Sequence, residues 1–194
     1  MDFVVGIGQS LQVDGEFVSW LRVGDKSLNG NERNVLLRNR GGETPDFVGA
    51  GYVAGVDRLE DTRGLGVIDI DLDGDLDIVV QGVEKPSVLL VNQGTPNNYL
   101  EVRLKGVKNR SGVGARIEAR VGSRLIMREV TSTGGFISGR SLMSHFGLRD
   151  ATRVDELIVY WPSGTRTTLH NVPANQLLWI EEVADGGAGQ DPNS

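Results

Sequence analysis

Short apolar segments recur along the chain, with turn residues between them. In segments such as YLEVRL, residues 99–104, apolar and polar side chains alternate, and this period of two is typical of a strand with one buried face. A helical period is hard to find, because glycine interrupts nearly every window that is long enough to carry one. The pattern therefore predicts an all-β fold.

The composition changes near residues 95–98. Before this point two similar segments, NVLLRNRGG (34–42) and SVLLVNQGT (87–95), lie 53 residues apart, a spacing typical of a propeller blade or a similar four-stranded unit. After it, longer alternating segments carry arginine and glutamate on one face. We therefore expect a β region over 1–98, a second β domain over 99–184 and a glycine-rich tail over 185–194.

The second domain is expected to be a β-sandwich or a barrel-like structure. The alternation along its strands assigns every second side chain to the interior. The residues expected to face inward over 99–182 are Leu100, Val102, Leu104, Ile117, Val121, Ile126, Leu157, Val159, Trp161, Leu178 and Ile180.

Aspartate occupies every second position over much of the stretch VIDIDLDGDLDIVV, residues 67–80. The alternation is typical of a strand, yet aspartate is depleted in strands, and carboxylates this close together repel one another. The nearest basic residues in the sequence, Arg63 and Lys85, lie outside the run. A bound cation is therefore the first candidate for the neutralising charge.

The spacing D-x-D-x-D-G-x-x-D suits a cage of oxygen ligands. It begins like an EF-hand loop, but Val80 stands where that loop needs a bidentate glutamate. Gly74 permits a sharp turn, so that alternate carboxylates and a backbone carbonyl near Asp75 can converge on one ion. Ca²⁺ suits such a site better than Mg²⁺, because it tolerates about 6 to 8 irregularly placed oxygens. The candidate metal-site residues are Asp69, Asp71, Asp73, Asp75 and Asp77, and the side chain of Asp75 is expected to face solvent.

A solvated acidic turn without an ion is the alternative interpretation of this run. Catalysis of glycoside cleavage by a pair of these aspartates is not expected, because carboxylates held by calcium stay deprotonated and are poor proton donors.

Several of these segments together resemble known families. RGLGVIDIDLDGDLDIVVQG (63–82), which lies between the two similar segments, resembles an FG-GAP or VCBS repeat, whose blades in integrin-like propellers carry a calcium loop of this form. The later segments NNYLEVRLKGVKNRSGVGARIEARV (97–121), GGFISGRSLMSHFGL (134–148) and VDELIVYWPSGTRTTLHNVPANQLLWIEE (154–182) resemble the ASPIC/UnbV domain of the cartilage acidic protein family and its bacterial relatives. The resemblance implies an all-β protein that is secreted or surface-bound, and it supplies no catalytic residues.

The loop 109–114 contains two glycines that permit positive φ. We expect it to be a shaped hairpin, and an anion or a sugar hydroxyl as its ligand is the alternative. Its first three residues, Asn109-Arg110-Ser111, also form a glycosylation sequon.

Aromatic and histidine residues after residue 140 are mostly expected to be structural. Trp161 is expected to seal an edge of the core, although an exposed Trp161 or Tyr160 would suit carbohydrate. His145 is expected to be a hydrogen-bonded structural histidine, and neither it nor His170 has the spacing of a metal site or a catalytic triad. The sequence thus predicts that the protein is not an enzyme.

Charge and composition exclude several classes of partner. The net charge of -6 argues against nucleic acid, because phosphate binding needs clustered lysine and arginine. The chain has no cysteine, so it has neither disulfides nor thiolate metal ligands. No segment approaches the run of about 18 apolar residues that a membrane helix needs, so membrane insertion is not expected.

Together these features predict a calcium-stabilised extracellular or cell-surface protein with a structural or adhesive role. Residues 1–98 hold too few units to close a propeller, which needs about four blades or more, so their sheet edges are expected to pair with another chain. The apolar segment Phe3 to Ile7 is the candidate strand donor, and the expected product is a homo-oligomer or filament with adhesive function. A carbohydrate-binding or carbohydrate-processing surface module is the alternative function.

Overall fold

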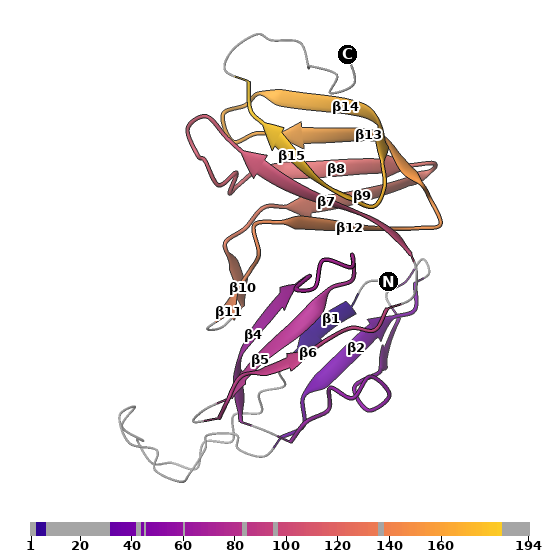
Figure 1. The fold of residues 1–194 in the computed structure, drawn as a ribbon, viewed down its shortest axis with the longest axis vertical. Helices are drawn as coiled ribbons and strands as arrows, with labels where there is room; N and C mark the ends of the chain where they lie inside the picture. Colours follow the sequence, from indigo (N-terminus) through magenta and orange to yellow (C-terminus); the bar gives the residue numbers. More distant parts are fainter. Residues whose placement is uncertain are drawn as a thin grey trace. The chain divides into compact units, whose positions relative to one another are not determined.

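A computed structural model describes residues 3–6, 32–41, 44, 46–59, 61–82, 85–94, 97–135 and 138–183 of the 194-residue chain (Figure 1). Within these ranges all regular structure is strand, so the all-β prediction is confirmed. The described residues include no helix that is long and apolar enough to span a membrane. The chain divides into two compact units. The first consists of Met1–Leu65 and Val79–Leu90, and the second consists of Gly66–Ile78 and Val91–Ser194.

An antiparallel sheet of three strands lies in the first unit. Its strands β1 (Phe3–Gly6), β2 (Val35–Asn39) and β3 (Phe47–Gly49) have the order β1-β2-β3. The segment expected to donate a strand to another chain pairs here with β2 of the same chain, with Val4 opposite Leu37. Ile7, the last residue of that expected donor, lies outside the described residues.

A second sheet of three strands flanks the aspartate run. Its strands β4 (Thr62–Ile68), β5 (Asp77–Gly82) and β6 (Val88–Leu90) follow one another in the order β4-β5-β6. The run itself is a loop rather than a strand, because strand structure ends at Ile68 and begins again at Asp77. Leu72 and Gly74 have φ angles of 61° and 94°, and these left-handed conformations fold the run back on itself.

The C-terminal domain contains two larger sheets and a short two-stranded one. The four-stranded sheet is antiparallel throughout, and its order is β14-β13-β8-β9. The three-stranded sheet has the order β12-β7-β15, in which β15 runs parallel to β7 and β12 antiparallel to it. The strands are β7 (Asn98–Lys105), β8 (Arg116–Val121), β9 (Arg124–Glu129), β12 (Ser144–Arg149), β13 (Arg153–Tyr160), β14 (Arg166–Pro173) and β15 (Gln176–Glu181), and β10 (Thr133–Gly135) pairs with β11 (Ser138–Gly139).

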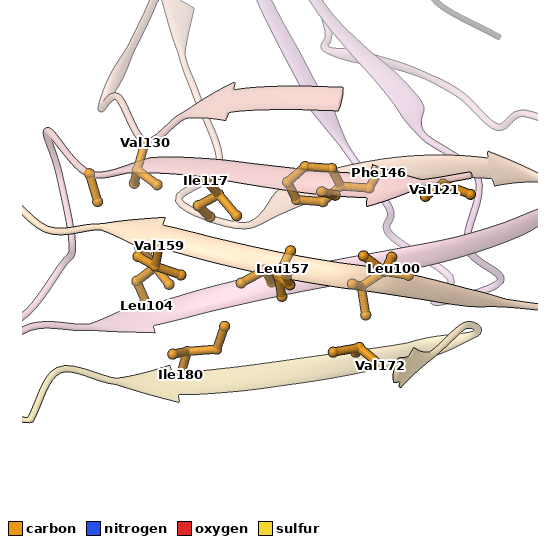
Figure 2. Close-up of a cluster of buried hydrophobic side chains, with 14 of the residues drawn as sticks. Leu100, Leu104, Ile117, Val121, Val130, Phe146, Leu157, Val159, Val172 and Ile180 are labelled. Carbon is orange, nitrogen blue, oxygen red and sulfur yellow. The ribbon is translucent and has the colours of Figure 1, made fainter. Parts of the chain in front are cut away.

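One hydrophobic core receives side chains from both of the larger sheets (Figure 2). All eleven residues expected to face inward belong to it or pack against it, with Ile126 and Leu178 half-buried and the others buried. The core also contains Phe146 and Leu148 of β12 and Val154 of β13, which the sequence analysis did not assign. The alternation thus identified the inner faces correctly, and β12 adds a third strand to the wall of the core formed by β7 and β15.

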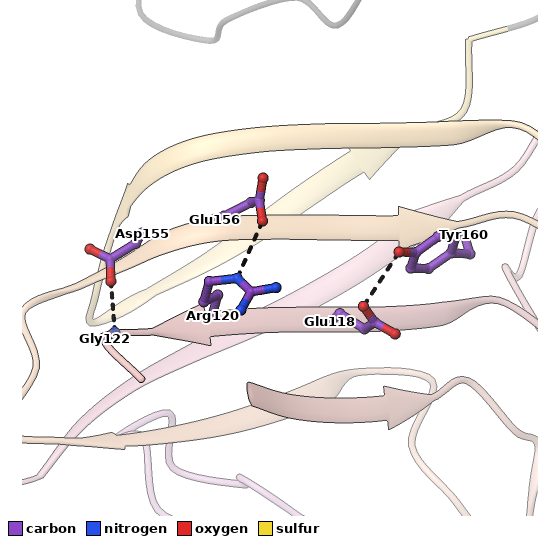
Figure 3. A network of polar contacts seen from close by, with 6 residues as sticks. All are labelled: Glu118, Arg120, Gly122, Asp155, Glu156 and Tyr160. Carbon is purple, nitrogen blue, oxygen red and sulfur yellow. Dashed lines mark hydrogen bonds and ion pairs between the residues drawn. The ribbon is translucent and has the colours of Figure 1, made fainter. Parts of the chain in front are cut away.

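The outer face of the four-stranded sheet carries charged cross-strand pairs, as the arginine and glutamate pattern predicted (Figure 3). Arg120 Nε lies 3.5 Å from Glu156 Oε2, and the Tyr160 hydroxyl donates a hydrogen bond to Glu118 at 3.4 Å. The Arg116 guanidinium lies 4.5 Å from the centroid of the Tyr160 ring. Such pairs stabilise a sheet by about 0.2 to 1 kcal/mol each, so stabilisation of the sheet explains the charged residues on this face.

Candidate metal site

Three aspartates of the loop between β4 and β5 point toward a common place. One carboxylate oxygen from each of Asp69, Asp71 and Asp77 lies within 4.8 Å of the other two. Asp69 and Asp77 are buried, with 3% and 1% of their surface exposed, whereas Asp71 is exposed. The site therefore has a buried side formed by two carboxylates and an open side formed by the third.

Backbone amides hold the two buried carboxylates. Asp77 accepts hydrogen bonds from Ile70 N at 2.9 Å and from Asn92 N at 2.8 Å, so both of its oxygens are oriented. Asp69 Oδ2 accepts a hydrogen bond from Gly74 N at 2.9 Å. These bonds link both ends of the loop and orient its carboxylates before any ligand arrives.

The other oxygen of Asp69 is the exception. Among the described residues Asp69 Oδ1 is buried and has no hydrogen-bond partner. A buried carboxylate oxygen without a partner costs free energy, because it loses its hydration and gains nothing in return. Two further carboxylate oxygens lie within 4.8 Å and would add repulsion when ionised, and a cation between the three groups would offset both costs.

Asp73 and Asp75 lie outside the group of three. Asp73 is exposed, and its Oδ1 accepts a hydrogen bond from Asp75 N at 2.9 Å, which stabilises the turn. The side chain of Asp75 is half-buried against Gly94, where even a methyl group would collide with its carboxylate. The expectation that Asp75 faces solvent is therefore wrong, because the loop folds back toward residues 92–94.

Two aspartates of the loop have raised pKa values. Partial desolvation and the charges of Asp73 and Asp77 raise the pKa of Asp71. Desolvation, followed by the charge of Asp73, likewise raises the pKa of Asp75. In both residues desolvation is the largest cause and neighbouring carboxylates add to it, and a cation nearby would lower both pKa values.

The turn of the loop is attached to β7 and β12. His145 Nε2 donates a hydrogen bond to the Gly74 carbonyl oxygen at 2.8 Å. The Gly74 backbone also lies against the ring of Tyr99, where a Cβ atom would overlap the ring carbons. The Tyr99 and His145 rings are stacked, with centroids 6.1 Å apart and planes 7° apart. Glycine is therefore required at position 74 for two reasons, the positive φ of the turn and the close approach of its backbone to Tyr99.

His145 itself is a structural residue, as expected from the sequence. Burial lowers its pKa, and the hydrogen bond to Gly74 O opposes that shift. A neutral imidazole that carries its proton on Nε2 satisfies this bond. His170, in contrast, is exposed on β14 and lies opposite Glu156.

Glu101 is a buried carboxylate that the sequence analysis did not identify. It lies on β7 opposite His145 and has only 3% of its surface exposed. Burial, and then the negative charge of Asp69, raise the pKa of Glu101 to about 7. The alternation in YLEVRL assigns Glu101 to the face away from the core, and no local signal indicates that another segment covers that face.

Trp161 and the loop 109–114, the alternative binding sites considered from the sequence, both have structural roles. Trp161 is 4% exposed, and its indole N-H donates to Thr167 Oγ1 at 2.8 Å, so it seals the core as expected. In the loop 109–114 the Asn109 side chain donates to Val113 O at 2.8 Å and accepts a bond from Ser111 Oγ at 2.6 Å. This loop is a shaped connection, but not a hairpin, because it joins β7 and β8 of different sheets.

Comparison with known proteins bears on the C-terminal domain. No curated protein sequence matches the chain. The family described as ASPIC and UnbV matches residues 106–186, which span β8 to β15 and begin after the aspartate loop and β7. The match supports an ASPIC/UnbV domain over residues 106–186 of this chain.

Proposed function

We propose that the chain is a calcium-binding β protein with an extracellular structural or adhesive role. In this proposal one Ca²⁺ ion binds between Asp69, Asp71 and Asp77 and stabilises the loop that lies against β7 and β12. The observation that carries the proposal is the buried Asp69 Oδ1, which lacks any partner among the described residues.

The chemistry of the ligands supports calcium. All three candidate side chains are carboxylates, and hard oxygen ligands suit Ca²⁺, Mg²⁺ or Mn²⁺ rather than Zn²⁺ or copper. The set is irregular and open on the Asp71 side, so Asp73, backbone carbonyls and water can complete a coordination shell of about 6 to 8 ligands. Mg²⁺ is the weaker candidate, since it requires a near-ideal octahedron and gives up its water reluctantly.

The proposal also includes a fold assignment for each of the two regions of the chain. We assign the aspartate loop, with β4 and β5 at its ends, to an FG-GAP or VCBS type of unit, supported by the loop spacing and by the strands on either side of it. We assign residues 99–182 to a β-sandwich, supported by the single core that both larger sheets share.

Assembly into an oligomer or filament stays a prediction. β1 already pairs with β2 of its own chain, so strand addition to a neighbour by this segment requires its release from that pair. β3 forms the other edge of the same sheet and offers a second place for pairing.

One observation supports carbohydrate binding as the second candidate function. Trp179 of β15 is 58% exposed, and the Arg103 guanidinium lies 5.6 Å from the centroid of its ring. Leu177, two residues away on the same face, is 45% exposed. An exposed tryptophan held by an arginine is a platform on which a sugar ring can stack. Saturable glycan-array binding that W179A abolishes would favour this function, and its absence would remove it.

The calcium proposal is tested by titration and thermal unfolding. At a hundredfold excess of Ca²⁺ over the dissociation constant, linkage adds about 2.7 kcal/mol to the free energy of unfolding. For a chain of this size that corresponds to a chelator-dependent fall in Tm of about 5 to 10 °C. D69N and D77N should lose calcium binding, whereas D150N, an exposed aspartate of the same unit, should retain it. Identical melting curves with calcium and with chelator would contradict the proposal.

A further inference from the structure

Glu101 is a buried acidic residue that the three-aspartate site leaves unexplained. It is 3% exposed, and the described residues provide no hydrogen bond or ion pair for its carboxylate. Glutamate is almost never fully buried without a partner, because the charged form loses its hydration. A compensating interaction is therefore expected at this position.

The strand geometry places Glu101 under the aspartate loop. Leu100 and Val102 point into the core, so Glu101 lies on the opposite face of β7, with Tyr99 two residues before it and His145 opposite it on β12. Tyr99 and His145 are the residues that hold Gly74 of the loop. The segment that covers this face of β7 is consequently the loop that carries the candidate metal ligands.

Asp69 and Glu101 are two buried carboxylates, and the charge of one affects the ionisation of the other. The charge of Asp69 acts on Glu101 and opposes its ionisation. Asp69 and Glu101 are each 3% exposed, and Asp69 Oδ1 is buried without a hydrogen-bond partner among the described residues. Both carboxylates, Asp69 on the loop and Glu101 on β7, are thus buried without an ion pair among the described residues.

A purely structural role accounts poorly for this arrangement. A protonated Glu101 would need an acceptor for its proton, and an ionised Glu101 would need a donor; the described residues provide it with neither. A leucine or methionine at this position would fill the space without the desolvation cost. A cation between the loop and β7 compensates Asp69 and Glu101 at once.

We propose that Glu101 is a further residue of the cation site, so that an ion held by the aspartate loop also joins that loop to β7 of the C-terminal domain. This inference rests on the proposed calcium function. Glu101 lies outside the group of three oxygens that are within 4.8 Å of one another, so it acts on the ion through a bound water or after a small movement of its side chain. The ion then links the loop to the domain in addition to the Gly74 contacts.

The test compares E101Q with E156Q in the full chain. Both substitutions exchange a carboxylate for an amide of the same shape, but Glu156 lies on the four-stranded sheet and pairs with Arg120 (Figure 3). Calcium affinity is measured by calorimetry, and Tm is measured both in calcium and in chelator. E101Q should weaken calcium binding by about 10- to 100-fold, as substitutions around metal sites typically do, and E156Q should leave it unchanged.

The Tm in calcium and the Tm in chelator together distinguish a role of Glu101 in the cation site from a purely structural role. In chelator E101Q should melt at the same temperature as the unchanged chain or higher, because it removes repulsion from Asp69, while its calcium-induced rise in Tm should shrink. A substitution that only damages packing would lower Tm in both conditions, and this result would overturn the inference. Unaltered calcium affinity in E101Q would also overturn it, without affecting the proposed function. Absence of calcium binding by the unchanged chain would instead contradict the proposed function itself.

Discussion

His145 on β12 donates a hydrogen bond to the carbonyl oxygen of Gly74, 71 residues earlier in the chain, at 2.8 Å. This bond attaches the turn of the aspartate loop to the sheet that forms one side of the core of the C-terminal domain. Gly74, in the turn between the carboxylates, is thereby held against Tyr99 of β7 and His145 of β12. A site prepared in this way loses less conformational entropy when its ligand arrives.

Substitution of Gly74 by alanine is expected to destabilise the chain strongly. The residue has a φ of 94°, and an added Cβ would overlap the Tyr99 ring, so the loop must leave its position. Gly164 is a matched control, because its φ is 93° but an added Cβ meets open space. Backbone strain of about 1 to 3 kcal/mol applies to both positions, and only G74A adds the steric overlap. Equal losses in urea unfolding would show that the contact with Tyr99 contributes nothing.

Removal of the His145 imidazole is expected to loosen the loop. H145A loses a half-buried hydrogen bond and the stacking with Tyr99, which together contribute about 1 to 3 kcal/mol to the free energy of unfolding. H170A removes an exposed imidazole and should change that free energy by less than about 0.5 kcal/mol. Faster hydrogen exchange at the amide of Gly74 in H145A, but not in H170A, would locate the effect in the loop. Equal protection in both variants would contradict it.

The stability of the calcium-free protein should depend on pH through Glu101. Its pKa is raised from 4.5 to about 7 in the folded chain, so the folded state binds this proton more tightly than the unfolded state does. The resulting stability is fully present below pH 4.5 and is lost as the pH rises through 7. The Tm of the unchanged chain relative to E101Q should therefore fall between these pH values in chelator.

With calcium present this difference should reverse at neutral pH, because the ion favours the ionised carboxylate. The comparison with E101Q removes the opposing contribution of His145, whose lowered pKa adds stability that is lost as the pH falls. Parallel melting profiles of the two proteins across this pH range would show that Glu101 does not titrate as described.

Truncation of Phe146 is expected to reveal how much β12 contributes to the core. Its ring is fully buried among side chains of both larger sheets (Figure 2), so F146A should cost about 3 to 5 kcal/mol in free energy of unfolding. L125A, on a residue of β9 that is 54% exposed, should cost less than about 0.5 kcal/mol. Chemical denaturation followed by tryptophan fluorescence measures both. A small loss in F146A would contradict the central position of β12.

The sequence by itself determined the class of the fold and the faces of its strands. Strict alternation in YLEVRL predicts that Leu100, Val102 and Leu104 point inward, and all three are buried. This succeeds because the side-chain direction in a strand depends only on local backbone geometry. The aspartate spacing likewise identified a region of negative charge without help from distant residues.

Only the tertiary structure decided which carboxylates meet. The sequence treats Asp71 and Asp73 as equivalent, but the turn at Leu72 and Gly74 brings Asp71 to Asp69 and Asp77 and leaves Asp73 outside the group. The parallel pairing of β15 with β7, and the connection of β7 to a different sheet by the loop 109–114, also depend on contacts between segments far apart in the chain.

Glu101 illustrates the same limit most directly. Its sequence pattern is that of a solvent-facing strand residue, but it is buried on the face of β7 where Tyr99 and His145 contact Gly74 of the aspartate loop, about thirty residues earlier. Periodicity reports which side of a strand a residue occupies, but which segment packs on that side is a property of the folded chain. The charge of the loop was therefore readable from the sequence, whereas its attachment to Tyr99 and His145 required the three-dimensional arrangement.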